Sequence, residues 1–233
     1  MNIKNYLTIV IPCKNERLLI VETLKYLNKQ KHISGTKVII SDSSDDNTID
    51  IVNSFVFDNL DIKIISGGTP SVARNNGFSS VETPYVLFLD SDIFLLKPTI
   101  IYECLSEIIS KSYHLISIRL RCKGKYSFVY PMFEFFRDII SFKYPFAVGG
   151  FMLFDSAKFT EVGKFDELNL FAEDFNLSLK ISPKKFKIMN LTGFTPDRRF
   201  KKKGLFYMVN MAVKSMINKN NPEFFNKDHD YWK

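Results

Sequence analysis

An unbroken apolar run and the two carboxylates that end it constrain this sequence most. Residues 85–89 are Tyr, Val, Leu, Phe and Leu, and Asp90, Ser91 and Asp92 follow directly. Such a run is typical of a strand buried on both faces, as in a parallel sheet covered by helices. Ligands of open α/β sheets bind at the carboxyl ends of the strands, so the sequence predicts a binding site at these aspartates.

The two aspartates suit a hard cation. Side chains at positions i and i+2 of an extended chain point to the same side, so both carboxylates could reach one divalent ion, directly or through its water. A ribose hydroxyl is the other candidate partner. A solvated turn is the alternative interpretation of Asp-x-Asp, but the place of this one after a buried strand favours the binding site.

Strands and helices alternate over the first hundred residues. Apolar runs predict strands at 7–12, 37–41, 62–65 and 85–89, and helical spacing predicts helices at 18–27, 48–56 and 72–79. The alternation predicts an α/β fold with a mostly parallel central sheet and helices on both faces. The second half is less regular, with a further strand predicted at 115–120.

Composition is ordinary for a globular protein, with 45% hydrophobic and 24% charged residues. The chain contains no apolar run of 18 or more residues, and its first residues lead into a strand rather than a signal-peptide core. We therefore expect a cytoplasmic protein, with the inner face of the membrane as a further position. The three cysteines have no metal-type spacing, so free thiols are expected.

The net charge of +7 is unevenly placed, because residues 180–203 contain nine Lys or Arg and one acidic residue. Such a block suits the phosphates of a nucleotide, a nucleic acid or an anionic lipid surface, and a solvated basic face is the alternative. Nucleic acid is the least favoured partner, because it would leave the carboxylates unexplained.

Two later segments are unusually apolar. Residues 126–146 contain nine aromatic side chains, which suit either core packing or a surface that faces lipid or an acceptor. A stripe at helical spacing follows near the C-terminus. We expect this stripe to dock on the core, with a membrane interface as the alternative; it comprises Phe206, Val209, Val213, Met216 and Ile217.

Short motifs occur in a definite order along the chain, at residues 11–16, 41–48, 73–77, 90–92, 149–151, 165–167 and 173–174. In this order they resemble motifs of the inverting family 2 glycosyltransferases, which have the GT-A nucleotide-sugar-binding fold. The resemblance covers about residues 7–174 and extends more weakly to 204. It implies a GT-A domain over 1–204, with a nucleotide-sugar-binding half (1–97) and an acceptor half (98–204), before an amphipathic helix and tail (205–233).

The resemblance also implies roles for individual residues. Asp174 is the expected general base, and Glu173 positions the site or the donor sugar. Asp92 and Asp90 are expected to hold Mg²⁺ or Mn²⁺ on the donor diphosphate. The other expected donor-binding residues, of which Asp42 would lie against the base, are Pro12, Asn15, Glu16, Asp42, Arg74, Asn75, Asp90, Ser91, Gly149, Gly150, Arg198 and Arg199.

Each of these assignments has a structural alternative. Glu173 and Asp174 could be plain helix caps, Arg74 a partner in a surface ion pair, and Gly149 with Gly150 a simple turn. The sequence also departs from the family at Ser41 and Ser43, which stand in place of Asp and Gly.

Two further departures concern processivity and the metal. The Gln-x-x-Arg-Trp motif of processive synthases is absent, since residues 197–200 match it only loosely, so one sugar per encounter is expected. His32, His114 and His229 are expected to be surface or packing residues rather than metal ligands.

The function that follows is metal-dependent, inverting transfer of a sugar from a UDP- or GDP-sugar to a saccharide or lipid-linked acceptor. A nucleotidyltransferase is the first alternative, although residues 12–16 lack the Gly-rich phosphate loop with which such enzymes usually begin. A non-catalytic module that binds anionic lipid or nucleic acid is the second, and it would not explain the carboxylates.

Overall fold

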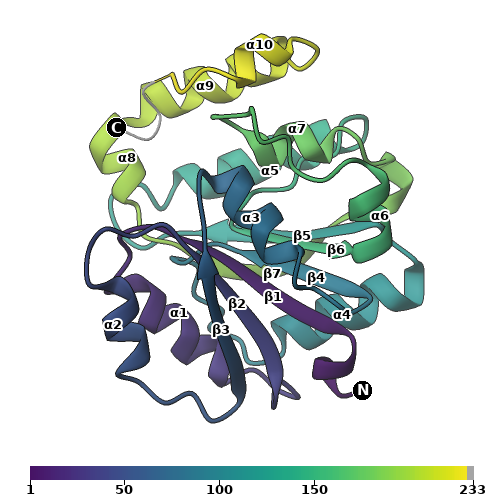
Figure 1. Ribbon diagram of the computed structural model, residues 1–233. Helices are drawn as coiled ribbons and strands as arrows, with labels where there is room; N and C mark the ends of the chain where they lie inside the picture. Colours follow the sequence, from purple (N-terminus) through teal and green to yellow (C-terminus); the bar gives the residue numbers. More distant parts are fainter. Residues whose placement is uncertain (230–233) are drawn as a thin grey trace.

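Over residues 1–229, which the computed structural model describes, seven strands form one sheet in the order β3-β2-β1-β4-β6-β5-β7 (Figure 1). β6 is antiparallel to β4 and β5, and the other described strand pairs are parallel. The mostly parallel sheet is therefore confirmed. The strands are β1 (Leu7–Cys13), β2 (Thr36–Asp42), β3 (Leu60–Ser66), β4 (Tyr85–Leu89), β5 (Leu115–Arg121), β6 (Phe151–Asp155) and β7 (Phe186–Phe194).

Helices cover both faces of this sheet, as Figure 1 shows. One face carries α1 (Leu19–Asn28), α2 (Thr48–Asn53) and α4 (Ile100–Lys111). The other carries α3 (Pro70–Phe78), α6 (Ser156–Glu161) and α7 (Glu173–Ser178). Two 3-10 turns, at Ile3–Asn5 and Pro183–Lys185, precede β1 and β7.

The central strands are apolar throughout because both their faces are buried. In β1, Ile9 packs with α1 and α4, whereas the neighbouring Val10 packs with the opposite layer, and both side chains are fully buried. Burying one such side chain contributes roughly 1.5–3 kcal/mol to the stability of the fold.

The sheet continues across the boundary expected between residues 97 and 98, because β4 of the first half pairs with β6 of the second half.

A third group of helices lies beyond the carboxyl ends of the strands. It comprises α5 (Val129–Ser141), α8 (Arg198–Lys203), α9 (Leu205–Ile217) and α10 (Pro222–Phe225). The tail expected at 205–233 extends into residues 230–233, which lie outside the described range. In residues 1–229 no helix has the length and apolar character needed to cross a bilayer.

Helix α9 is attached to the rest of the protein near both its ends. Before it, the ring of Phe200 packs against Tyr126 and Tyr130 at centroid distances of 5.6 Å. After it, Phe225 is fully buried and its carbonyl accepts hydrogen bonds from the backbone N–H groups of Leu170 and Phe171.

Core docking of the α9 stripe was the wrong prediction. Phe206 and Ile217 are 90% and 74% exposed, and Val209 and Val213 are about half exposed. The reason is that α9 touches the protein along a narrow line, at which Met211 and Ser215 are its buried residues.

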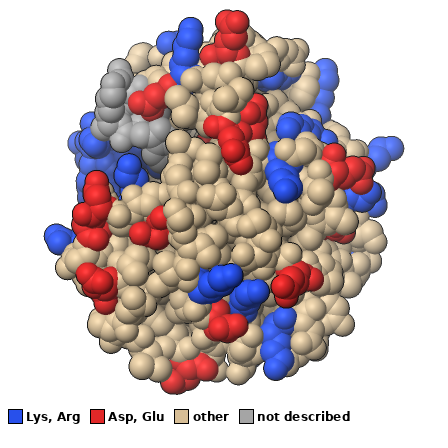
Figure 2. Space-filling model, viewed as in Figure 1, with Lys and Arg blue, Asp and Glu red and all other residues tan. Residues whose placement is uncertain are grey.

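The basic block does not form one surface. Strand β7 separates Lys184 and Lys185, which precede it, from α8, which follows it. Nine residues of extended chain span roughly 30 Å, so the two groups lie at opposite ends of the sheet. Figure 2 shows Lys and Arg side chains gathered at the left edge of the molecule, where Figure 1 places α8.

Candidate active site

A cavity of about 580 Å³ lies at the carboxyl ends of β4 and β7. Its polar end is lined by residues that the sequence predicted, namely Arg74, Asp90, Asp92, Gly149, Gly150, Glu173, Asp174, Arg198 and Arg199. The remaining lining is largely apolar and comes mainly from α5, α9 and the segments that flank α7. This size is typical of a site for a small organic ligand.

Arg74 connects two carboxylates at the polar end. Its Nη2 lies 2.7 Å from Oδ1 of Asp90, and its Nη1 lies 2.7 Å from Oε1 of Glu173. Arg74 and Glu173 are buried, whereas Asp90 is partly open to the cavity. A planar guanidinium suits this role, because it presents several N–H donors in a fixed geometry. Arg74 is therefore not the partner in a helix-surface ion pair that the alternative interpretation required.

Asp174 follows Glu173 in the first turn of helix α7, and two backbone N–H groups donate to its carboxylate. Gly149 N donates to Oδ2 at 2.5 Å, and Phe175 N donates to Oδ1 at 2.7 Å. Burial and the neighbouring Glu173 raise the pKa of the Asp174 carboxyl to about 6, although Arg74 and the two N–H groups oppose the shift. A carboxylate with a pKa near neutrality is suited to accept a proton.

Gly149 fits this place because it has no side chain. A Cβ there would lie 3.1 Å from Nη2 of Arg74 and 3.2 Å from Oδ2 of Asp174. A Cβ at Gly150 would lie 2.9 Å from Ile93. Gly149 thus lets the chain pass close to the charged groups, and Gly150 lets it pass close to an apolar side chain.

A second group of charges lies around Asp92. Arg198 of α8 donates to Oδ2 of Asp92 at 3.0 Å and forms a two-pronged ion pair with Glu16. Burial, Asp90 and Glu16 raise the pKa of Asp92 to about 6, and Arg198 opposes the rise. Negative charge is therefore concentrated here, next to a basic helix.

A divalent cation is compatible with this donor set. Asp90 and Asp92 offer carboxylate oxygens, which are the ligands that Mg²⁺ and Mn²⁺ prefer. Among residues 1–229 no cluster of three or more His, Cys, Asp or Glu is arranged to hold a metal. A protein contribution of one or two carboxylates, with substrate phosphate supplying the rest, is usual for Mg²⁺.

Other predicted residues lie outside the cavity lining. Asn75 points to the segment after β6, where its Nδ2 donates to the carbonyl of Phe165 and to Glu167. Asn15 adopts a left-handed backbone conformation (φ 57°), and its side chain accepts a hydrogen bond from Asp45 N. Both side chains therefore order loops around the site.

Pro12, Asp42 and Ser91 also lie outside the cavity lining, although near the ends of their strands. Asp42 ends β2 and accepts hydrogen bonds from the backbone N–H and the hydroxyl of Ser44. Pro12 lies opposite Ser41 in the pairing of β1 with β2. Ser91 is buried, and its carbonyl accepts from Thr23 Oγ1 at 2.8 Å.

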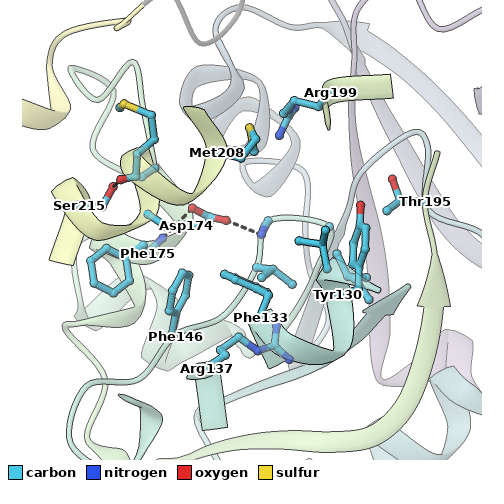
Figure 3. Close-up of a pocket in the computed structure, with 18 of the residues that line it drawn as sticks. Tyr130, Phe133, Arg137, Phe146, Asp174, Phe175, Thr195, Arg199, Met208 and Ser215 are labelled. Atoms are coloured by element: carbon cyan, nitrogen blue, oxygen red, sulfur yellow. Dashed lines mark hydrogen bonds between the residues drawn. The ribbon is translucent and has the colours of Figure 1, made fainter. Parts of the chain in front are cut away.

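Several residues of the cavity have no recognisable signal in the sequence. Ala172 adopts a left-handed conformation (φ 48°) immediately before Glu173, which such a residue seldom does without a tertiary cause. Tyr130 and Thr195 also line the cavity (Figure 3). Tyr130 belonged to the aromatic run, and only its position in the fold distinguishes it from the other rings there.

Known proteins resemble this chain in sequence and in fold. The model of glycosyl transferase family 2 matches residues 8–163. The poly(ribitol-phosphate) β-N-acetylglucosaminyltransferase TarS of Staphylococcus aureus is 30% identical over 99 residues, 40% of this chain and 17% of TarS. An uncharacterized glycosyltransferase of Haemophilus influenzae is 27% identical over 92 residues, 38% of this chain and 37% of that protein. The matched segments thus span less than two fifths of either relative.

Solved structures extend the likeness over more of the chain. Residues 1–349 of S. aureus TarS with UDP-GlcNAc superpose with a TM-score of 0.64 and 19% identity, covering 82% of this chain and 58% of that one. The mannosyltransferase PcManGT of Pyrobaculum calidifontis, with GDP-Man and Mn²⁺, gives a TM-score of 0.64 at 16% identity, covering 89% and 64%. At these identities the likeness shows the fold. The family model matches roughly two thirds of the chain, and the protein therefore belongs to glycosyl transferase family 2 and has the GT-A fold.

Proposed function

We propose that this protein transfers a sugar from a nucleotide-sugar donor to an acceptor hydroxyl, with inversion at the anomeric carbon. The observation that carries the proposal is the grouping of Asp90, Glu173 and Asp174 around Arg74 and Gly149, at the strand ends of a family 2 chain. Family membership favours this reaction over a nucleotidyltransferase and over a non-catalytic binding module.

The proposed donor is a UDP- or GDP-sugar. The similar structures named above contain UDP-GlcNAc and GDP-Man, so the fold accommodates both bases. In this chain Asp42, at the end of β2, is the carboxylate proposed to contact the base. Arg198 and Arg199 lie at the polar end of the cavity, where cations stabilise phosphate.

Asp90 and Asp92 are the residues proposed to hold a divalent metal, because they offer hard oxygen ligands beside the cavity. When bound, the metal supplies positive charge to the departing diphosphate. Arg198 pairs with both Asp92 and Glu16, so a cation that replaced it at Asp92 would leave it held by Glu16 at the polar end of the cavity.

Asp174 is proposed to remove the acceptor's proton. The acceptor oxygen forms a bond to the anomeric carbon as the bond from that carbon to the diphosphate breaks on the opposite face, which inverts the configuration. The proton passes to the Asp174 carboxylate, and the nucleoside diphosphate leaves. A positioned general base typically contributes on the order of a hundred- to ten-thousand-fold.

Glu173 is proposed to position the catalytic groups rather than to react itself. Arg74 holds it at 2.7 Å, and it is adjacent to Asp174, whose pKa it helps to raise. The Arg74 bridge therefore keeps the proposed base and the proposed metal ligand Asp90 in one fixed arrangement.

We place the reaction at a membrane surface, with one sugar transferred per encounter. Support comes from α8, whose sequence is Arg-Arg-Phe-Lys-Lys-Lys, and from the exposed apolar side chains of α5 and α9. Basic residues near an anionic bilayer contribute about 1 kcal/mol each. The acceptor is a saccharide or a lipid-linked molecule.

Donor binding tests the proposal. The wild-type protein is titrated calorimetrically with UDP, GDP and CMP, each with Mn²⁺ and with EDTA. We expect UDP or GDP to bind more tightly with Mn²⁺ than with EDTA, and CMP to bind weakly in both. Absence of UDP and GDP binding in both conditions would overturn the proposal.

A further inference from the structure

Helix α5 is inverted relative to an ordinary surface helix. Its Glu134 and Arg137 are 1% and 0% exposed, whereas Phe135 and Phe136 are 62% and 53% exposed, and Phe142, directly after the helix, is 86% exposed. An amphipathic helix of a globular protein normally buries its apolar stripe and exposes its charges. The outward apolar face of α5 therefore requires an explanation.

Polar contacts with β5 fix this rotation of α5. Arg137 lies 2.8 Å from Glu134 and donates to the carbonyl of Ile118 at 2.7 Å. Glu134 accepts from Leu120 N at 3.0 Å, and Arg119 pairs with Asp138 at 2.9 Å. Breaking such a buried pair is costly, so α5 cannot turn its phenylalanines inward.

The cavity of the candidate site continues between α5 and α9. Its lining there is apolar and includes Met132, Phe133 and Phe136 from α5 and Val209, Ala212 and Val213 from α9. Met132, Phe136, Val209 and Val213 are each about half exposed as well. They therefore form an apolar mouth between the two helices.

The polar end of the same cavity contains the proposed base. Figure 3 shows Asp174 with Met208 and Ser215 of α9 on one side and Phe133 and Phe146 on the other. One continuous space thus joins an apolar mouth to the carboxylates. A molecule that fills it needs an apolar portion at the mouth and a polar portion at Asp174.

Resting on the function proposed above, we infer that the acceptor is a lipid-linked molecule. Its apolar chain lies in the cavity between α5 and α9, and its hydroxyl-bearing head reaches Asp174. Lys201, Lys202 and Lys203 belong to α8, which lies with α5 and α9 beyond the carboxyl ends of the strands. The Nζ atom of Lys219 lies 5.1 Å from the ring centroid of Tyr144, just after the C-terminal end of α5. This charge complements an anionic bilayer, from which such a lipid would enter.

A second copy of the chain is the competing occupant of the exposed apolar face. It would cover Phe135 and Phe142, but it would leave the internal part of the cavity unfilled. The two occupants therefore respond differently to a change inside the cavity.

The test compares decyl β-D-glucopyranoside, below its micelle concentration, with methyl β-D-glucopyranoside by calorimetry. Both probes have the same head, so a difference reports the apolar chain. We expect the decyl probe to bind at least tenfold more tightly. Ala212→Trp, which fills the cavity, should remove that preference, whereas Asn210→Trp on the outer side of α9 and the exposed-face variant Phe142→Ser should keep it.

Equal binding of the two glucosides by the wild type would overturn the inference, whatever the variants do. Loss of the preference in Phe142→Ser but not in Ala212→Trp would assign the chain to the exposed surface and also overturn it. A concentration-dependent dimer with no decyl preference would assign the face to a second copy. UDP and GDP titrations of each variant separate these outcomes from failure of the proposed function, because donor binding does not depend on the apolar cavity.

Discussion

Nη1 of Arg74 lies 2.7 Å from Oε1 of Glu173, although 99 positions separate the two residues in the chain. Arg74 belongs to α3 and Glu173 begins α7, so the ion pair joins the two halves of the protein across the candidate site. Both side chains are buried, which makes the pair sensitive to the loss of either partner.

Removal of Arg74 should destabilise the fold. In Arg74→Met the Glu173 carboxylate is left buried without its cation, and the free energy of unfolding should fall by about 3–5 kcal/mol. Lys25→Met is the control, because it breaks the exposed Lys25–Glu22 pair and should cost about 0–1 kcal/mol. Urea unfolding measures the free energy of unfolding of both variants. Similar losses in the two would mean that the buried pair has no special structural role.

Asp92 should be required for metal-dependent donor binding. In Asp92→Asn one proposed ligand loses its charge, so the affinity for UDP or GDP should fall in Mn²⁺ and change little in EDTA. Asp61→Asn, at an exposed position of the edge strand β3, should behave as the wild type does. The metal assignment fails if the wild type binds the nucleotide equally well with Mn²⁺ and with EDTA.

Helix α8 should attach the protein to anionic bilayers. Changing Lys201, Lys202 and Lys203 together to Glu removes roughly 3 kcal/mol of attraction and adds repulsion, so binding should fall by at least about two orders of magnitude. Sedimentation with vesicles of phosphatidylcholine and phosphatidylglycerol measures this. As a control, changing Lys184 and Lys185, which precede β7, to Glu should have little effect on vesicle binding. A wild type that ignores these vesicles at low salt would argue for a soluble acceptor.

The first half of the fold could be predicted from the sequence because its strands are continuous apolar runs that helical segments separate. Strands β6 and β7 were missed. The first four residues of β6 are apolar, but such a short run does not show the direction of the strand or its neighbours in the sheet. In β7 lysine occurs within the strand, and we interpreted the segment as part of a charged block.

The site was predicted unevenly for similar reasons. Asp90 and Asp92 follow a recognisable strand, whereas Glu173 and Asp174 follow an irregular segment and were found through the family resemblance. The orientation of α5 was not predictable from periodicity, because its aromatic residues indicate a buried face. The ion pair between Glu134 and Arg137 decides the orientation instead, and it depends on partners in β5 that are distant in sequence.

The pH dependence of transfer should follow Asp174. A general base must be deprotonated, and burial with Glu173 raises the pKa of this carboxyl to about 6. The rate should therefore fall as pH decreases through about 6, by up to tenfold per unit below it, and should level off above about 7. Rates measured from pH 5 to 8 at saturating donor test this. A profile that is flat over this range would exclude Asp174 as the base.

The central claim is direct displacement with Asp174 as the base, and the transfer product of the wild type and of Asp174→Asn tests it most directly. The measurement is the anomeric configuration of the product by NMR, together with the transfer rate and the donor affinity of both proteins. We predict an inverted anomer, near-normal donor binding by Asp174→Asn, and a rate reduced by about two orders of magnitude or more. A retained anomer, or near-normal turnover by Asp174→Asn, would contradict the account.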